Sequence, residues 1–148
     1  MRNVPPDINF QIDAHVIANT TSNFQQASIY LYEDDENYFS VNRGYCDICP
    51  PKGSGIFSDY MFKGEMSFSF KGRAIDTDDV YLRITVNRET KTLIAYYAVE
   101  PDKWIQLRRI PLLYDINQVG LGATNSDNGK YDDNLIALFD YFEISILE

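Results

Sequence analysis

The chain has 148 residues, a length that suits one domain, and 45% of them are hydrophobic, enough for a core. Its 13 Lys and Arg against 22 Asp and Glu give a formal net charge of −9, which argues against a nucleic-acid backbone or an anionic membrane surface as a partner. No apolar run approaches the roughly 18 residues of a membrane-spanning helix, and no signal peptide is visible. We therefore expect neither a nucleic-acid partner nor membrane insertion.

Hydrophobic and polar residues alternate along the first part of the chain. Residues 8–16 are apolar at even positions and polar at odd ones, with His15 on the polar side. Residues 27–32 and 38–42 alternate in the same way. This period of two predicts strands with one buried face. The acidic residues 33–36 between them could bind calcium, but EF-hand spacing is absent, and Asp and Asn favour turns. We therefore predict a solvated hairpin turn there.

Further candidate strands follow at regular spacing. They cover residues 55–62, 66–70, 80–86, 92–99, 104–110 and 118–124. No segment carries a convincing 3.6-residue apolar stripe, so little or no helix is expected. About ten short strands with polar turns indicate an all-β fold, an antiparallel two-sheet jelly-roll sandwich.

The closing segment, residues 135–147, changes its apolar phase. Its apolar residues lie at odd positions before Asp140 and at even positions after Tyr141. A strand that passes through a β-bulge would produce this pattern. Asp140 interrupts an apolar strand, so we expect its carboxylate to have a compensating partner, either backbone N–H groups or a metal ion.

Three stretches together resemble the concanavalin A-like lectin and glucanase jelly roll, in the branch found as accessory domains of bacterial β-xylosidases and as stand-alone bacterial proteins. The first is residues 23–38, "NFQQASIYLYEDDENY". The second is "YLRI" at 81–84, with "AYY" at 95–97 and "KW" at 103–104. The third is "VGLGA" at 119–123 with "ALFDYF" at 137–142.

The resemblance implies one concanavalin A-like domain over residues 1–148, in which one or two strands that usually precede residue 7 are absent. It implies a carbohydrate-recognition or accessory module of a glycan-active system, extracellular or periplasmic. Catalytic members of the wider fold carry an E-x-D-x-x-E strand, which is absent here. We therefore expect no enzyme, and a glycoside hydrolase is the third alternative.

Aromatic residues on the polar sides of the strands are the candidate ligand contacts. Flat rings cover the apolar C–H faces of sugars, and polar side chains bind the hydroxyls. The competing interpretation is cross-strand packing, or a face that binds a neighbouring protein or domain. The candidate residues are Tyr30, Tyr32, Tyr81 and Arg83, joined by Tyr96 and Trp104.

A calcium ion often lies near the last strand in related jelly rolls. The resemblance therefore implies a calcium site at Asp127, Asp132 and Asp140, with Asp133 also available. No cofactor is required. His15 lacks a second histidine and a nucleophile elbow, so we interpret it as a surface residue.

The pair Cys46 and Cys49 forms a lone C-x-x-C followed by Pro50 and Pro51. A structural zinc site needs more ligands, and the prolines exclude the helix of a thioredoxin-type site. We favour a local disulfide, which would indicate an oxidising compartment. Two free thiols and half of an intermolecular zinc site are the alternatives.

Overall fold

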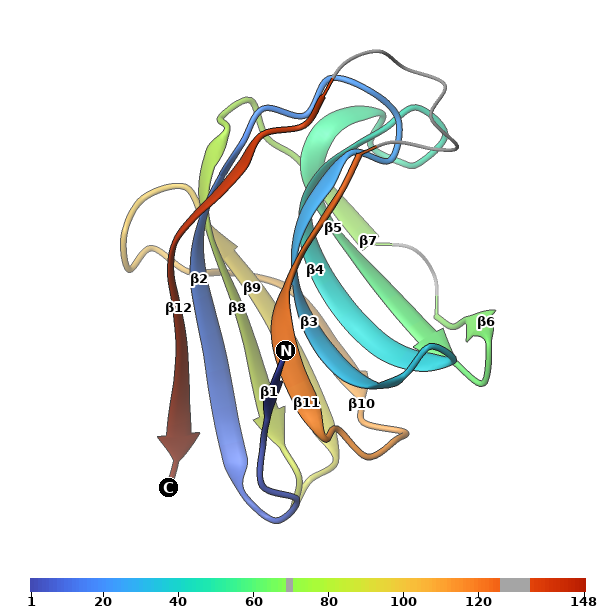
Figure 1. Cartoon of the computed structure of the whole chain (residues 1–148), viewed down its shortest axis with the longest axis vertical. Helices are drawn as coiled ribbons and strands as arrows, with labels where there is room; N and C mark the ends of the chain where they lie inside the picture. The colour runs from blue at the N-terminus through green and yellow to red at the C-terminus, as the bar shows by residue number, and fades with distance from the viewer. Residues whose placement is uncertain (69–70, 126–133) are drawn as a thin grey trace.

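A computed structural model describes residues 1–68, 71–125 and 134–148. It consists of two antiparallel sheets stacked face to face, with no helix in the described residues (Figure 1). The predicted all-β sandwich is therefore confirmed. Within the described part of the chain, no helix is long and apolar enough to cross a membrane.

The seven-stranded sheet has the order β1-β11-β3-β4-β5-β6, and β7 pairs with β5. Figure 1 shows β3 and β4 bent along their length, with the inside of the bend facing away from the other sheet. Its strands are β1 (Arg2–Asn3), β3 (Gln26–Asp34), β4 (Asn37–Cys46), β5 (Gly53–Phe62), β6 (Glu65–Met66), β7 (Lys71–Ala74) and β11 (Gln118–Thr124).

The five-stranded sheet has the order β10-β9-β8-β2-β12. Neighbouring strands are paired over most of their length, with one register shift in the β10–β9 pairing and one in the β12–β2 pairing. Its strands are β2 (Asn9–Ala18), β8 (Asp79–Asn87), β9 (Thr92–Ala98), β10 (Ile105–Pro111) and β12 (Ala137–Leu147).

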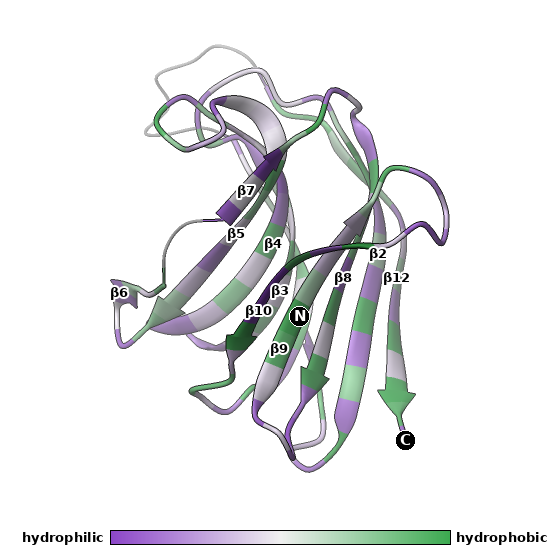
Figure 2. Cartoon of the chain, turned by 180° about the vertical axis from the view of Figure 1, so that it is seen from behind, coloured by the Kyte–Doolittle hydropathy of each residue, from purple (hydrophilic) through white to green (hydrophobic). Residues whose placement is uncertain are grey.

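The core lies between the sheets and follows the period-two pattern of the sequence. Along β2, for example, Phe10, Ile12, Ala14 and Val16 are fully buried. Figure 2 shows the same alternation as green and purple bands along β2 and β8. Each large aliphatic side chain buried in this way contributes roughly 1.5–3 kcal/mol relative to leaving it exposed.

The predicted phase change in the last strand is confirmed as a bulge. The pairing of β12 with β2 shifts register between Phe139 and Tyr141, which leaves Asp140 as the extra residue. Phe139 and Phe142 both pack against the core, whereas Tyr141 lies on the outer face beside His15. The bulge therefore allows one strand to keep an apolar inner face on both sides of Asp140.

The predicted strand at residues 66–70 is wrong. β6 ends at Met66, and Phe68 has a φ of 63°, a left-handed conformation that breaks a strand. Residues 69 and 70 lie outside the described residues. The two-residue β1 and the short β7 were not predicted, because neither is long enough to show alternation.

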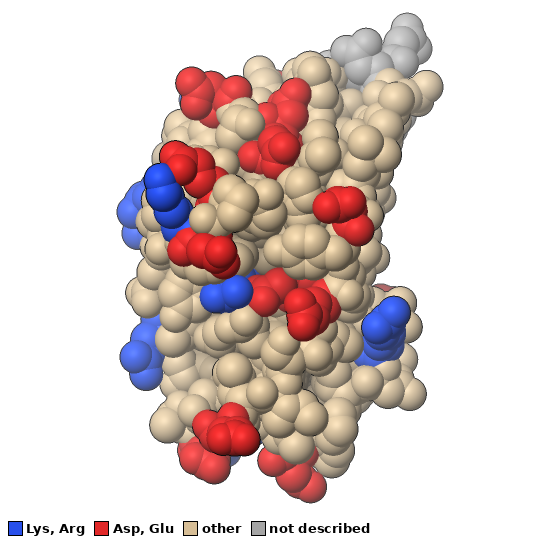
Figure 3. Space-filling view, turned by 90° about the vertical axis from the view of Figure 1, so that its left-hand side faces the viewer, with Lys and Arg blue, Asp and Glu red and all other residues tan. Residues whose placement is uncertain are grey.

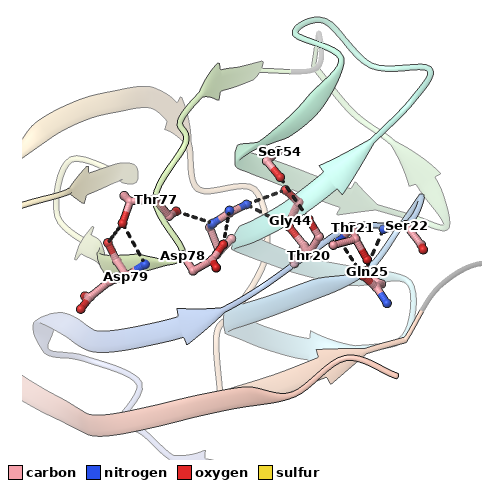
Figure 4. A network of polar contacts seen from close by, with 10 residues as sticks. Thr20, Thr21, Ser22, Gln25, Gly44, Ser54, Thr77, Asp78 and Asp79 are labelled. Atoms are coloured by element: carbon pink, nitrogen blue, oxygen red, sulfur yellow. Dashed lines mark hydrogen bonds and ion pairs between the residues drawn. The ribbon is translucent and has the colours of Figure 1, made fainter. Parts of the chain in front are cut away.

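A buried arginine joins the two sheets at one end of the sandwich (Figure 4). The Arg43 side chain is 1% exposed, and its guanidinium donates to Thr20 Oγ1 at 2.9 Å, Thr77 O at 3.0 Å and Gly44 O at 3.0 Å. It also pairs with Asp78 Oδ1 at 3.1 Å. Burial lowers the pKa of Arg43, and Asp78 opposes this effect. These contacts satisfy the buried charge and fix the loops before β3 and β8.

Candidate functional site

The six predicted ligand residues lie on two different faces of the molecule. Tyr30 and Tyr32 lie on β3, on the outer face of the seven-stranded sheet. Tyr81, Arg83 and Tyr96 lie on β8 and β9 of the five-stranded sheet, and Trp104 contacts Arg83 there. One platform that combines all six residues is therefore wrong, because the core separates the two groups.

The outer face of the seven-stranded sheet contains a hollow of about 380 Å³, which we call the tyrosine hollow. It lies over β3, the β3–β4 hairpin and β11, on the inside of the bend seen in Figure 1. Its main lining residues are Tyr30, Tyr32, Asp35, Tyr38, Leu121 and Gly122.

The β3–β4 pairing sets the positions of the three tyrosines. Tyr32 lies opposite Tyr38, and Tyr30 lies two residues along the same face. The rings of Tyr30 and Tyr38 meet edge to face, with centroids 6.2 Å apart. The Tyr32 hydroxyl donates to Asp35 Oδ1 at 2.6 Å, and this hydrogen bond raises the pKa of Tyr32. Burial raises the pKa of Tyr38, so both rings are neutral hydroxyl donors and acceptors at neutral pH.

Two glycines on β11 allow neighbouring side chains to lie close to the sheet. Gly122 is on the outer face, and a Cβ atom there would lie 2.6 Å from Cε2 of Tyr30. Gly120 lies directly opposite Tyr30, and a Cβ there would lie 2.3 Å from Sδ of Met1. Real side chains do not approach so closely, so the sequence G-L-G shapes this part of the hollow.

The outer face of the five-stranded sheet is organised around an ion pair. Arg83 donates to both carboxylate oxygens of Asp13, from Nε at 2.6 Å and Nη2 at 3.1 Å. Gln11 donates to the same carboxylate at 2.7 Å. The guanidinium of Arg83 also lies over the ring of Trp104, 3.9 Å from its centroid. Arg83 and Trp104 thus contact each other and do not form an open binding surface.

A second cluster on this face surrounds His15. Its ring stacks on Tyr81 with centroids 4.4 Å apart and an interplanar angle of 8°. Its Nε2 lies 2.6 Å from Asp79 Oδ1, and its Nδ1 lies 3.2 Å from Asp140 Oδ2. Burial lowers the pKa of His15, but the hydrogen bonds and charges of both carboxylates outweigh burial and raise it above its ordinary value.

The two faces therefore differ in how much ring surface remains available. On the five-stranded sheet, neighbouring side chains already cover one side of the Tyr81 and Trp104 rings, and Tyr96 lies next to Arg83 in register. Figure 3 views the molecule from this side and shows separate acidic groups with fewer basic ones between them. The tyrosine hollow is the better candidate for a ligand site.

Of the residues that line the tyrosine hollow, the sequence predicted Tyr30 and Tyr32 as ligand contacts but missed the polar side chains of Tyr38 and Asp35. The predicted turn after β3 is confirmed, since Asp34 Oδ1 accepts hydrogen bonds from Glu36 N and Asn37 Nδ2, both at 2.9 Å. Treating the whole insert as solvated hid the contact of Asp35 with Tyr32. The signal that could have found Tyr38 was its alternation onto the same face as Tyr32.

The predicted calcium site cannot be assembled from the described residues. Asp127, Asp132 and Asp133 lie outside them, and the described residues contain no group of three His, Cys, Asp or Glu that could hold a metal. Asp140 lies beside His15, and its carboxylate is 71% exposed. The calcium site therefore stays a prediction. The partner that the structure shows for Asp140 is His15, which the sequence analysis interpreted as a surface residue.

Cys46 and Cys49 lie at the end of β4 and in the loop that follows it. The structure joins their Sγ atoms in a disulfide across a sequence separation of three residues. The backbone N–H of Cys49 points back to Sγ of Cys46 at 3.1 Å. The pair forms a local staple of the β4–β5 connection and takes no part in either sheet face.

Several solved structures are similar to this chain. A GH43 protein from Bacillus licheniformis matches with a TM-score of 0.77 and 16% identity, over 94% of this chain and 28% of that one. A xylan β-1,4-xylosidase from Bacillus halodurans matches with a TM-score of 0.72 and 16% identity, over 94% and 28% of the two chains. A tetrameric galectin from the ball sponge Cinachyrella sp. has a TM-score of 0.61 and 10% identity, over 97% and 96%.

The fold is a concanavalin A-like β-sandwich. At these identities the similarity shows the fold alone. The chain spans 28% of the length of the two bacterial proteins, so it corresponds to one part of each. No protein-family model and no curated protein matches the sequence.

Proposed function

We propose that this chain is a non-catalytic carbohydrate-recognition module, and that the tyrosine hollow binds the sugar. The observation that carries the proposal is the hollow itself, where three tyrosines and Asp35 surround about 380 Å³ beside a glycine-containing strand. The solved structures that share the fold include a galectin and a xylan β-1,4-xylosidase. That similarity supports the choice of ligand class, and the hollow supports the choice of site.

The chemistry of the hollow suits a neutral sugar ring. The half-buried rings of Tyr30 and Tyr38 offer apolar surface for the C–H face of a pyranose. Asp35 accepts hydrogen bonds from sugar hydroxyls, and its contact with the Tyr32 hydroxyl holds it in place. With a chain net charge of −9, an anionic glycan would be repelled.

The same residues support binding without catalysis. Glycosidases of the two-carboxylate type place two Asp or Glu residues on opposite sides of the bond to be cleaved. Asp35 is the one carboxylate among the described residues that line the hollow, and it lies on a hairpin turn. A lone acceptor of this kind orients a sugar but does not supply a general acid.

The proposal can be tested by a glycan array followed by nuclear magnetic resonance titration of the isotope-labelled chain. Xylobiose and lactose are suitable first probes, given the solved structures that share the fold. We expect weak binding with shift changes around Tyr30, Tyr32, Tyr38 and residues 121–124. If no neutral glycan binds, or if all changes map to the five-stranded sheet, the proposal is wrong.

A protein-interaction module is the second candidate function. Trp, Tyr and Arg contribute most to interface energies, and the outer face of the five-stranded sheet presents Trp104, Tyr81 and Arg83 together. A chain that fails to bind glycans but associates with itself or another protein would favour this function. Loss of that association in Trp104→Ala, measured by light scattering, would identify the face.

A further inference from the structure

A cavity lies at one end of the sandwich. It has a volume of about 630 Å³, and we call it the end cavity. The β3–β4 hairpin, the turns after β5 and β8, and the segment between β10 and β11 all contribute to it. The residues that matter for its chemistry are Glu33, Asn37, Phe62, Lys63, Lys91 and Tyr114.

Hydrogen bonds between side chains and backbone groups connect the walls of the end cavity. Arg88 donates to Ile8 O at 3.1 Å, Pro5 O at 3.2 Å and Ile116 O at 2.8 Å, which ties the segment before β2 to the segment before β11. Lys63 N donates to Asn37 Oδ1 at 3.0 Å. The loops and turns that line the cavity are therefore held in place by hydrogen bonds to one another.

A bulge directs Glu33 into the end cavity. The β3–β4 pairing shifts register between Tyr32 and Asp34, so Glu33 is the extra residue. Tyr32 and Asp35 line the tyrosine hollow, whereas Glu33 and Asn37 line the end cavity. Burial raises the pKa of Glu33, and the charges of Asp34 and Asp115 add to this effect. The Glu33 carboxylate is thus a hydrogen-bond acceptor beside other acids.

Tyr114 adds a buried hydroxyl whose hydrogen-bonding capacity is unmet. The residue lines the cavity and is 8% exposed, and its hydroxyl, which is itself shielded from solvent, has no hydrogen-bond partner in the described part of the chain. The neighbouring Tyr60, 5.5 Å away between ring centroids, is a useful contrast. The Tyr60 hydroxyl donates to Pro111 O at 3.2 Å and accepts from Leu113 N at 3.1 Å. Buried hydroxyls are normally satisfied as Tyr60 is.

We propose that the end cavity is a second binding site, and that it takes a neutral, hydroxyl-rich molecule of one or two sugar rings. Its volume lies within the range of roughly 300–1,000 Å³ typical of small-molecule sites. Glu33 and Asp115 would repel an anion, and Lys63 and Lys91 would repel a cation. Hydroxyl groups can donate to the carboxylates and accept from the lysines, while Phe62 packs on the C–H face of a ring.

This site is independent of the proposed sugar binding by the tyrosine hollow. The two share the β3–β4 hairpin but use different residues of it, so one can be removed while the other is kept. The variant for the end cavity is Glu33→Gln, and its matched control is Glu36→Gln at the exposed tip of the same hairpin. Tyr30→Ala is the variant that affects the hollow alone.

The test is a nuclear magnetic resonance titration with xylobiose and, separately, with inorganic phosphate. We expect xylobiose to shift resonances of Glu33, Lys63, Lys91 and Asp115, and phosphate to leave them unchanged. In Glu33→Gln we expect the xylobiose affinity obtained from these shifts to fall roughly tenfold, as for loss of a hydrogen bond to a charged group. Tyr30→Ala and Glu36→Gln should leave them as in the wild type.

The outcomes separate the two proposals. Shifts at the end cavity that persist in Tyr30→Ala support the second site, whether or not the hollow binds. Shifts at the hollow alone overturn the second site and leave the first. A response to phosphate rather than xylobiose would mean that the lysines determine an anion site, which contradicts the proposed ligand class. Thermal unfolding of each variant shows whether a lost response reflects a lost fold, and Asp115→Asn, an exposed change, then repeats the test.

Discussion

The outer faces of the two sheets have similar compositions but opposite organisation. Both carry several aromatic residues next to acidic ones. On the five-stranded sheet, Trp104 is covered by Arg83, and Tyr81 by His15. On the seven-stranded sheet, Tyr30 and Tyr38 border a hollow. Outward alternation of aromatic residues therefore does not by itself mark a binding face, because the partners of the rings decide whether a ligand can reach them.

The difference has a local cause on each sheet. The strand β2 of the five-stranded sheet lies between β8 and β12 and contributes Asp13 and His15, which pair with residues of those two strands. The strand β11 of the seven-stranded sheet contributes Gly120 and Gly122, and the Met1 side chain and the Tyr30 ring lie directly against them. Charge pairing covers the rings of one face, whereas on the other face Gly122 lets the Tyr30 ring lie against the sheet beside the hollow.

The largest expected effect separates the faces by stability. Arg83→Met keeps an apolar stem over Trp104 but leaves the Asp13 carboxylate, 10% exposed, without its cation. We expect the free energy of unfolding to fall by about 2–3 kcal/mol, somewhat less than for a fully buried pair. Urea denaturation measures it, and Arg73→Met at an exposed position is the control. A stable variant with weakened sugar binding would instead restore the predicted ligand role of Arg83.

The next effect separates the faces by affinity. Tyr30→Ala removes a ring that borders the hollow, and we expect affinity for a bound glycan to fall roughly tenfold, or about 1.4 kcal/mol. Tyr81→Ala removes a ring of the same kind on the five-stranded sheet and should leave the affinity unchanged. Calorimetric titration of both variants compares the faces directly. Equal losses would mean that the faces do not differ in function.

A smaller effect tests how the hollow is shaped. In Gly122→Ala the new Cβ would meet the Tyr30 ring at 2.6 Å, so the ring must move. We expect a loss of about 1 kcal/mol in unfolding free energy, typical of mild overpacking, and a few-fold loss of affinity. In a Tyr30→Ala background the same substitution should cost almost nothing, because the clash is gone. If Gly122→Ala lowered the unfolding free energy equally in the wild-type and Tyr30→Ala backgrounds, the Tyr30 ring would not be in contact with Gly122.

The sequence was sufficient for the fold, because alternation is a direct consequence of a sheet with one buried face. It predicted the strands around Phe10–Val16 and the bulge at Asp140 for the same reason. It did not predict which strands share a sheet, since the pairing of β3 with β11 joins residues about ninety positions apart. The six ligand residues are divided between two faces because β3 belongs to one sheet and β8 and β9 to the other, and this assignment was missed.

The bulges set a second limit. Asp140 was recognisable because apolar residues flank it, and their phase visibly reverses. Glu33 is also a bulge residue, but it lies in a run of acids where no phase can be seen. The role of His15 was missed because its two partners, Asp79 and Asp140, are distant in sequence.

The smallest expected effect concerns His15, which joins three strands of the five-stranded sheet. A protonated imidazole donates to Asp79 and Asp140 at once, whereas a neutral ring has a single N–H to donate. The other ionisable groups nearby are Tyr141 and Tyr81, with Asp13, Arg83 and Glu143 further along the face. Histidine is the side chain whose ordinary pKa lies near neutral pH, so this prediction concerns the protonation of His15.

Because the pKa of His15 is raised in the folded state, protonation stabilises the fold. This contribution is fully present below the unfolded-state pKa of about 6.5 and is lost as the pH rises through the folded-state pKa. His15→Phe keeps the stack on Tyr81 but removes the charge. We expect the wild type to lose up to about 1 kcal/mol relative to this variant between about pH 5.5 and 8.5, a modest value because both carboxylates are more than half exposed. Urea denaturation at several pH values measures the difference, and Asp140→Asn should reduce it. Parallel pH profiles for the wild type and His15→Phe would show that the ring contributes by stacking alone, and the five-stranded face would then be held together by Arg83 and Asp13.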